Sequence, residues 1–113
     1  MLKSQTINNI HVVSFADSDR FNSPIAEPVK ESLLEYFNKS NVKLVLDLSG
    51  IKFIDSSGFG VFLSVMKAAN NNYGSFKICN VNKEVMELFK LLQLHNVFEI
   101  YQDLDECLKS FEK

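Results

Sequence analysis

The residues best suited to chemistry are gathered in one short stretch, IKFIDSSGFG, which directly follows an apolar run. The stretch supplies an acid, two hydroxyls and two glycines: Asp55, Ser56, Ser57, Gly58 and Gly60. These residue types are too polar and too flexible to continue a strand. Four roles for such a turn can be compared: a helix start, a catalytic serine, a phosphate cradle, and a serine that accepts a phosphoryl group.

Two of these roles lack the residues that they need. A hydrolase elbow requires glycine two residues before and two after the serine, but Ile54 stands two residues before Ser56. The only histidines, His11 and His95, have no sequence relation to that serine. The phosphate-loop pattern G-x-x-x-x-G-K-[ST] is also missing, and the carboxylate of Asp55 would repel a phosphate. We therefore expect no catalytic residues, no metal site and no enzyme.

The other two roles stay open from the residues alone. In the structural role, Ser56 or Ser57 caps a helix and the glycines allow the helix to approach a strand closely. In the phosphoacceptor role, modification adds about −1.5 to −2 charges at a helix N-terminus. The helix dipole tolerates that charge while Asp55 opposes it, so the fold would change little and the surface potential would change strongly.

Composition limits the setting in which this turn works. The 113 residues, 46% apolar and 23% charged, fit a single domain spanning 1–113. A net charge of −2 leaves no basic stripe for direct nucleic-acid binding. No apolar run approaches the roughly 18 residues of a membrane span, and MLKSQTINNI lacks the apolar region of a signal peptide. We expect a cytoplasmic protein without membrane insertion, in which Cys79 and Cys107 are reduced thiols.

Strands and helices alternate along the chain, which predicts parallel strand pairing through right-handed crossovers. The expected strands are 3–7, 10–15, 42–48, 75–81 and 96–101, and the expected helices are 24–37, 59–71, 82–94 and 103–113. An Asn-Asn pair predicts a tight hairpin between the first two strands. The fold class is α/β, with a mixed, mostly parallel sheet of four to five strands and about four helices.

The first helix and the segment before it are less well defined. Residues 16–23 are expected to form a loop, and Ser23 followed by Pro24 suits a helix cap and first helical position. Pro28 would delete a backbone hydrogen bond further in. Either the first turn is irregular or the helix begins near Pro28.

The segment VLDLSGIKFIDSSGFGVFLSVMKAA resembles the central part of the STAS domain, especially that of bacterial anti-sigma factor antagonists. Their pattern is a hydrophobic strand, a short turn, an apolar-Asp-Ser-[Ser/Ala/Thr]-Gly stretch and a helix. NVNKEVMELFKLLQLHNVFEIYQDLDECL continues the resemblance, which covers residues 5–112. The first forty residues match more loosely.

The resemblance implies a partner-switching function. Such antagonists bind an anti-sigma factor that is often also a serine kinase, and this capture frees a sigma factor until the antagonist is phosphorylated. The matching phosphoacceptor is Ser56, with Asp55 shaping the docking site and Ser57 and Gly58 shaping the turn. ATP belongs to the partner, so no cofactor is expected here, and a serine phosphatase is a further expected partner.

The chain departs from the family pattern before the first helix. Many members carry Gly-x-Leu-Asp there, whereas this chain has RFNS, with Asn22 in the place of the acid. Asp17 and Asp19 are candidates to replace its charge. Phe59 is open to two interpretations, as a partner contact or as part of the core. An alternative function is that of a STAS subunit in a transporter or signalling complex that works without phosphorylation.

Overall fold

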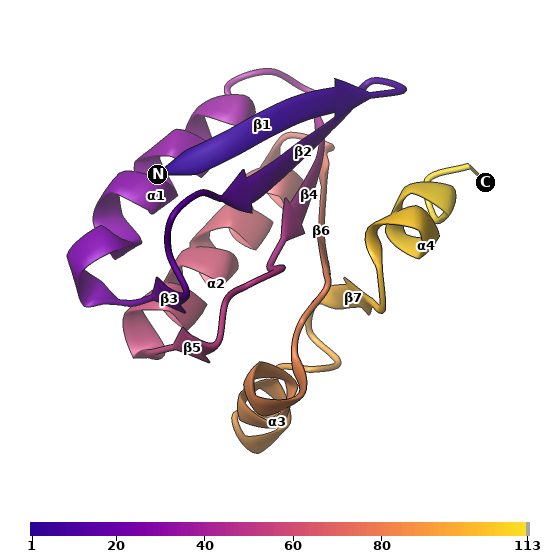
Figure 1. Cartoon of the computed structure of the whole chain (residues 1–113). Helices are drawn as coiled ribbons and strands as arrows, with labels where there is room; N and C mark the ends of the chain where they lie inside the picture. The colour runs from indigo at the N-terminus through magenta and orange to yellow at the C-terminus, as the bar shows by residue number, and fades with distance from the viewer. Residues whose placement is uncertain (113) are drawn as a thin grey trace.

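The computed structural model describes residues 1–112 and contains a five-stranded mixed sheet in the order β1-β2-β4-β6-β7 (Figure 1). The strands are β1 (Leu2–Ile7), β2 (Ile10–Phe15), β4 (Lys43–Asp47), β6 (Ser75–Cys79) and β7 (Glu99–Tyr101). β1 and β2 are antiparallel, and the other pairs are parallel. In the middle, Leu44, Val45 and Leu46 of β4 are fully buried, as expected for a strand covered on both faces.

The β1–β2 hairpin turns at the predicted Asn-Asn pair. Asn8 and Asn9 have φ angles of 52° and 67°, the left-handed conformation that asparagine tolerates better than most residues. The predicted tight hairpin is therefore confirmed.

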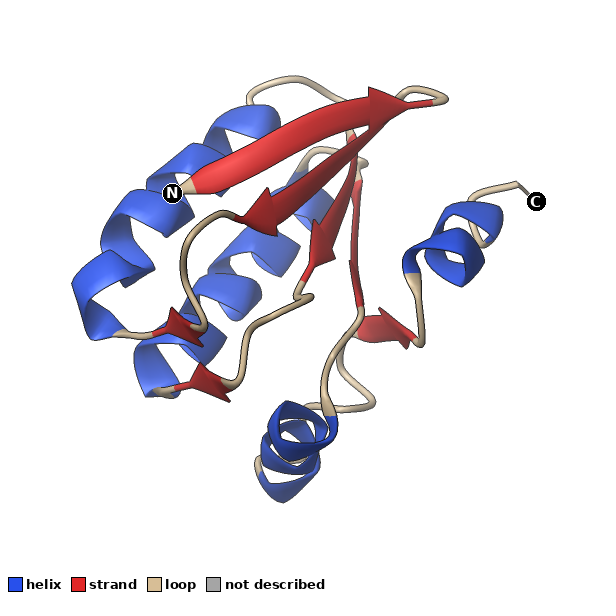
Figure 2. Cartoon of the chain, viewed as in Figure 1, coloured by secondary structure: helices blue, strands red, loops and turns tan. Residues whose placement is uncertain are grey.

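Four helices pack against the sheet within the described residues: α1 (Ser23–Tyr36), α2 (Ser56–Asn71), α3 (Lys83–Leu91) and α4 (Leu104–Lys109). Figure 2 shows α1 and α2 side by side on one face and α4 on the other side of the sheet. The main core lies beneath α1 and α2 and includes Val85 and Phe89 of α3. A smaller core lies beneath α4. In the described part of the chain, no helix is long and apolar enough to cross a membrane.

Packed phenylalanines join α2 to α3 and to the sheet. The ring of Phe62 stacks parallel to that of Phe89, with centroids 5.9 Å apart, and meets that of Phe98 edge-on at 6.0 Å. Offset and edge-on pairs of this kind add to the free energy gained by burying the rings. These ring contacts hold the end of α2 that carries the serines against α3 and the sheet.

The α/β fold class is confirmed, but three local predictions are wrong. Residues 16–23 are not only a loop, because Arg20–Phe21 forms a short strand, β3, that pairs in parallel with β5 (Phe53–Ile54). The cap of α1 is Asn22 rather than Ser23, and α1 continues through Pro28 without a break. The third helix, predicted over 82–94, ends at Leu91, and Leu92 beyond its end is 50% exposed.

Candidate functional site

The β3–β5 ladder places the start of α1 beside the start of α2. Phe21 pairs with Ile54, so the next residues along each strand, Asn22 and Asp55, lie level with each other. The backbone N–H of Asp55 donates to the carbonyl of Phe21 at 3.2 Å and continues this alignment. Two segments more than thirty residues apart in sequence therefore meet at one surface, close to Ser56.

The Asp55 carboxylate caps both helices. Its Oδ1 accepts from the backbone N–H of Gly58 in α2 at 3.1 Å, and its Oδ2 accepts from the backbone N–H of Ser23 in α1 at 3.0 Å. A negative charge at two positive helix ends is favourable. The structural role in which Ser56 or Ser57 caps α2 is not the one observed, because Asp55 caps this helix.

Both serines of the turn are left without a structural role for their hydroxyls. Ser56 and Ser57 occupy the first two positions of α2 and are exposed. Within residues 1–112, neither hydroxyl has a hydrogen-bond partner in the protein. The turn thus presents two free hydroxyls on a fixed backbone.

The other half of the same turn is buried. A Cβ on Gly58 would lie 2.6 Å from Cγ2 of Ile54 and 2.9 Å from the carbonyl oxygen of Phe21, so only glycine lets α2 approach the β3–β5 ladder this closely. Phe59 is only 4% exposed and meets the ring of Phe89 edge-on at 4.9 Å. Of the two interpretations of Phe59, the core role is the one observed.

Asn22 differs from Asp55 although both are helix caps. Asn22 is the N-cap of α1, but its side chain makes no capping hydrogen bond, since Asp55 takes the N–H of Ser23 instead. The Asn22 side chain is partly exposed beside the serine turn. The structure therefore brings together the sequence-predicted residues Asn22, Asp55, Ser56 and Ser57.

A polar groove of about 490 Å³ extends from this turn between α1 and α2, and sequence reasoning missed it. Its lining includes a salt bridge between Lys30 and Glu27, 3.4 Å apart, and two small residues of α2, Ser57 and Gly60. The full lining is Ser23, Ala26, Glu27, Lys30, Ser57, Gly60, Val61 and Ser64. The only signal in the sequence was the row of small residues on one side of α2.

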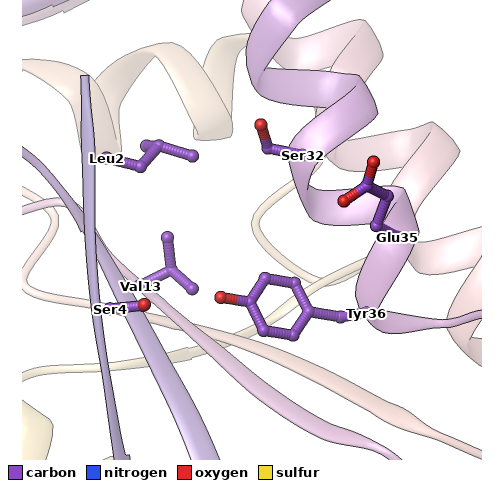
Figure 3. A pocket seen from close by; sticks show the side chains of 6 residues that line it. All are labelled: Leu2, Ser4, Val13, Ser32, Glu35 and Tyr36. Carbon is purple, nitrogen blue, oxygen red and sulfur yellow. The ribbon is translucent and has the colours of Figure 1, made fainter.

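A separate cavity of about 390 Å³ lies between the β1–β2 hairpin and the C-terminal half of α1 (Figure 3). Its lining is Leu2, Ser4, Val13, Ser32, Glu35 and Tyr36. Ser32 stands nine positions beyond Ser23 on α1, which corresponds to about 13 Å of helix. This cavity is therefore distinct from the serine turn.

The surroundings of Ser56 do not form a catalytic centre. The ring of His11 packs against Tyr36 at the far end of α1, with centroids 5.0 Å apart. Both Asp55 oxygens already accept backbone N–H groups, so this carboxylate is positioned as a cap rather than as a base. Across residues 1–112, no group of three or more His, Cys, Asp or Glu side chains could hold a metal ion.

The model of the STAS domain family matches residues 4–107, and the chain belongs to this family. It is 25% identical over 99 residues to the anti-sigma-B factor antagonist of Listeria monocytogenes, covering 88% of this chain and 84% of that protein.

Solved structures agree on the fold. An anti-sigma-factor antagonist (STAS) domain protein from Planctomyces limnophilus superposes with a TM-score of 0.91 at 20% identity, covering 99% of this chain and 98% of the other. The Bacillus cell fate determinant SpoIIAA in its phosphorylated form gives a TM-score of 0.73 at 14% identity, with both chains fully covered.

Proposed function

We propose that this chain is an anti-sigma factor antagonist that is switched by phosphorylation of Ser56. In the unmodified state it captures an anti-sigma factor and so releases a sigma factor. The anti-sigma factor is also a serine kinase that carries its own ATP, and a serine phosphatase restores the unmodified state. The named relative supports the partner class, because it is an antagonist of an anti-sigma factor.

One observation supports a phosphoacceptor at the start of α2, and the resemblance to the family pattern selects Ser56, the serine directly after Asp55. Asp55 caps α2 through its carboxylate, so the exposed Ser56 hydroxyl is not needed to hold the helix. A serine retained only for capping would accept a backbone N–H at the helix end, as Asp55 does here. In the transfer step, Ser56 Oγ attacks the γ-phosphorus of the partner's ATP, ADP leaves, and the hydroxyl proton passes to a base on the partner.

The geometry supports a switch that works through charge rather than through unfolding. A phosphate on Ser56 would add about −1.5 to −2 charges beside the Asp55 carboxylate. The N-terminus of α2 stabilises part of that charge, and the buried half of the turn, Gly58 and Phe59, stays packed. The partner would then meet a much more negative surface around Asn22 and Ser57.

Pull-downs from cell lysate with four baits test this proposal: wild type, Ser56→Ala, Ser56→Asp and Ser40→Asp. Ser40 is an exposed loop residue, so its variant adds the same charge away from the turn. We expect wild type, Ser56→Ala and Ser40→Asp to retain a kinase-type ATPase, and Ser56→Asp to lose at least about 100-fold in affinity, because it puts an unpaired charge in a desolvated contact.

Incubation of the captured ATPase with ATP completes the test. Wild type should gain one phosphoryl group, mapped to Ser56 by peptide mass spectrometry, and Ser56→Ala should gain none. A captured ATPase that modifies neither serine would overturn the switch but leave the binding function. Capture of transporter subunits in its place would favour the STAS subunit that works without phosphorylation.

A further inference from the structure

The face of the sheet opposite α1 and α2 buries two thiols that the proposed switch does not use. Cys79 ends β6 and Cys107 lies in the middle of α4, and both have no exposed surface. Both are free thiols and belong to the same small core, together with Ile10, Val12 and Val45. Figure 1 shows α4 as the helix that covers this face. The two cysteines therefore join the last helix to a central strand.

The side chain of Lys77 in β6 contacts the residues that follow α4 and so fixes the position of α4 on β6. Lys77, only 8% exposed, donates from Nζ to the hydroxyl of Ser110 at 2.8 Å, and its ammonium lies 4.0 Å from the ring centroid of Phe111. Lys77 precedes Cys79 by two residues on the same face of β6, and Ser110 follows Cys107 by one helical turn. The contact between Lys77 and Ser110 therefore brings Cys79 and Cys107 opposite each other.

The two thiols belong to one buried cluster and are not equivalent. The interaction between them raises the pKa of Cys79 and lowers the pKa of Cys107. Burial raises both pKa values, the Lys77 charge lowers that of Cys107, Glu99 and Asp47 raise it, and Asp47 and Asp103 raise that of Cys79. Cys107 is therefore the thiol that forms the nucleophilic thiolate more easily.

We propose that Cys79 and Cys107 form a reversible disulfide that fastens α4 to β6 when the protein meets hydrogen peroxide. The Cys107 thiolate attacks one peroxide oxygen, the O–O bond breaks, and hydroxide leaves to give a sulfenic acid. The Cys79 sulfur then attacks the Cys107 sulfur and loses its proton, and water leaves as the S–S bond forms. Two thiols are oxidised and one peroxide is reduced to two waters. Peroxide reaches the pair when α4 detaches locally.

Hydrogen peroxide treatment of the full chain tests the pairing. Intact mass should fall by two hydrogens, peptide mapping should link Cys79 to Cys107 within one chain, and a thiol reductant should reverse both results. Because the link closes a loop of nearly thirty residues, the midpoint of thermal unfolding should rise by roughly 10 °C. Cys107→Ser is the control that cannot form the link.

Two outcomes would overturn the pairing. One is separate oxidation of each cysteine to its sulfinic acid without the two-hydrogen loss, and the other is a disulfide that joins two chains. The route of peroxide has its own test, in which Ser110→Ala removes the hydroxyl that accepts from Lys77 and Ser40→Ala is the exposed control. We expect the disulfide to form several-fold faster in Ser110→Ala. Equal rates would contradict entry by detachment of α4.

Discussion

The starts of α1 and α2 lie side by side, but they are capped in opposite ways. The N-cap of α2, Asp55, holds its own helix through Gly58 and also takes the N–H of Ser23 at the start of α1. The N-cap of α1, Asn22, makes no side-chain cap at all. The Asp55 carboxylate therefore caps both helices. The side chains of Asn22, Ser56 and Ser57 are left free for a partner.

Removal of the shared cap is expected to have the largest effect on stability. Asp55→Ala leaves the N–H groups of Gly58 and Ser23 without their charged acceptor, which should cost about 2–3 kcal/mol of the free energy of unfolding. Asp55→Asn keeps one carbonyl oxygen and should lose about half of that amount. Urea unfolding of both variants gives the measurement.

A cost for Asp55→Ala no greater than that of a single ordinary cap, about 1 kcal/mol, would contradict the double role. It would mean that the bond to Ser23 contributes nothing in solution. In that case Asp55 would cap α2 only, and α1 would have no side-chain cap.

The buried half of the α2 start is tested by adding one methyl group. Gly58→Ala places a Cβ 2.6 Å from the Ile54 side chain and 2.9 Å from the Phe21 carbonyl oxygen, both on the β3–β5 ladder. We expect a loss of about 2 kcal/mol from this overpacking. Thermal and urea unfolding should show it.

Gly60 provides a matched control in the same turn. A Cβ at Gly60 meets no atom within 4 Å, so Gly60→Ala should stabilise the helix by about 0.5–1 kcal/mol through a smaller loss of backbone entropy. Equal effects of the two substitutions would contradict the close approach of α2 to the ladder at Gly58.

The two helix starts also show which features of the fold can be predicted from the sequence and which cannot. The strands, the helices and the serine turn follow from hydrophobic spacing and turn residues, because these depend on neighbours along the chain. The β3–β5 ladder has only two residues in each strand, too few for any pattern. Without that ladder, nothing in the sequence places Ser23 beside Asp55. The serines therefore looked like the natural caps, and the resemblance alone suggested a place for Asn22.

The two cysteines on the opposite side of the sheet show the same limit of prediction from sequence. Cys79 and Cys107 lie far apart in the sequence and carry no motif, and the prediction of reduced thiols agrees with the structure, in which both are free. That they share one buried core depends on the placement of α4, which Lys77 and Ser110 fix through a hydrogen bond between distant elements. Such side-chain contacts between elements are the part of a fold that periodicity does not encode.

The smallest effect on stability is expected at Asn22, the N-cap residue of α1 whose side chain makes no capping hydrogen bond. Asn22→Ala should change the free energy of unfolding by less than about 0.5 kcal/mol, because no hydrogen bond to α1 is lost. The matched control is Asn82, the N-cap of α3, whose side chain accepts from the N–H of Val85 at 2.8 Å. Asn82→Ala should cost about 1 kcal/mol.

Partner binding should reverse this order of the two asparagines. Asn22 lies beside Ser56, so Asn22→Ala should weaken capture of the anti-sigma factor about 10-fold, as loss of a contact in an interface does. Asn82→Ala should leave capture unchanged once the protein is folded. Equal losses of stability in both variants would show that Asn22 caps α1 in solution, and its side chain would then be unavailable to a partner. A folded Asn22→Ala variant with full affinity would instead place the partner on Ser57 and the groove between α1 and α2.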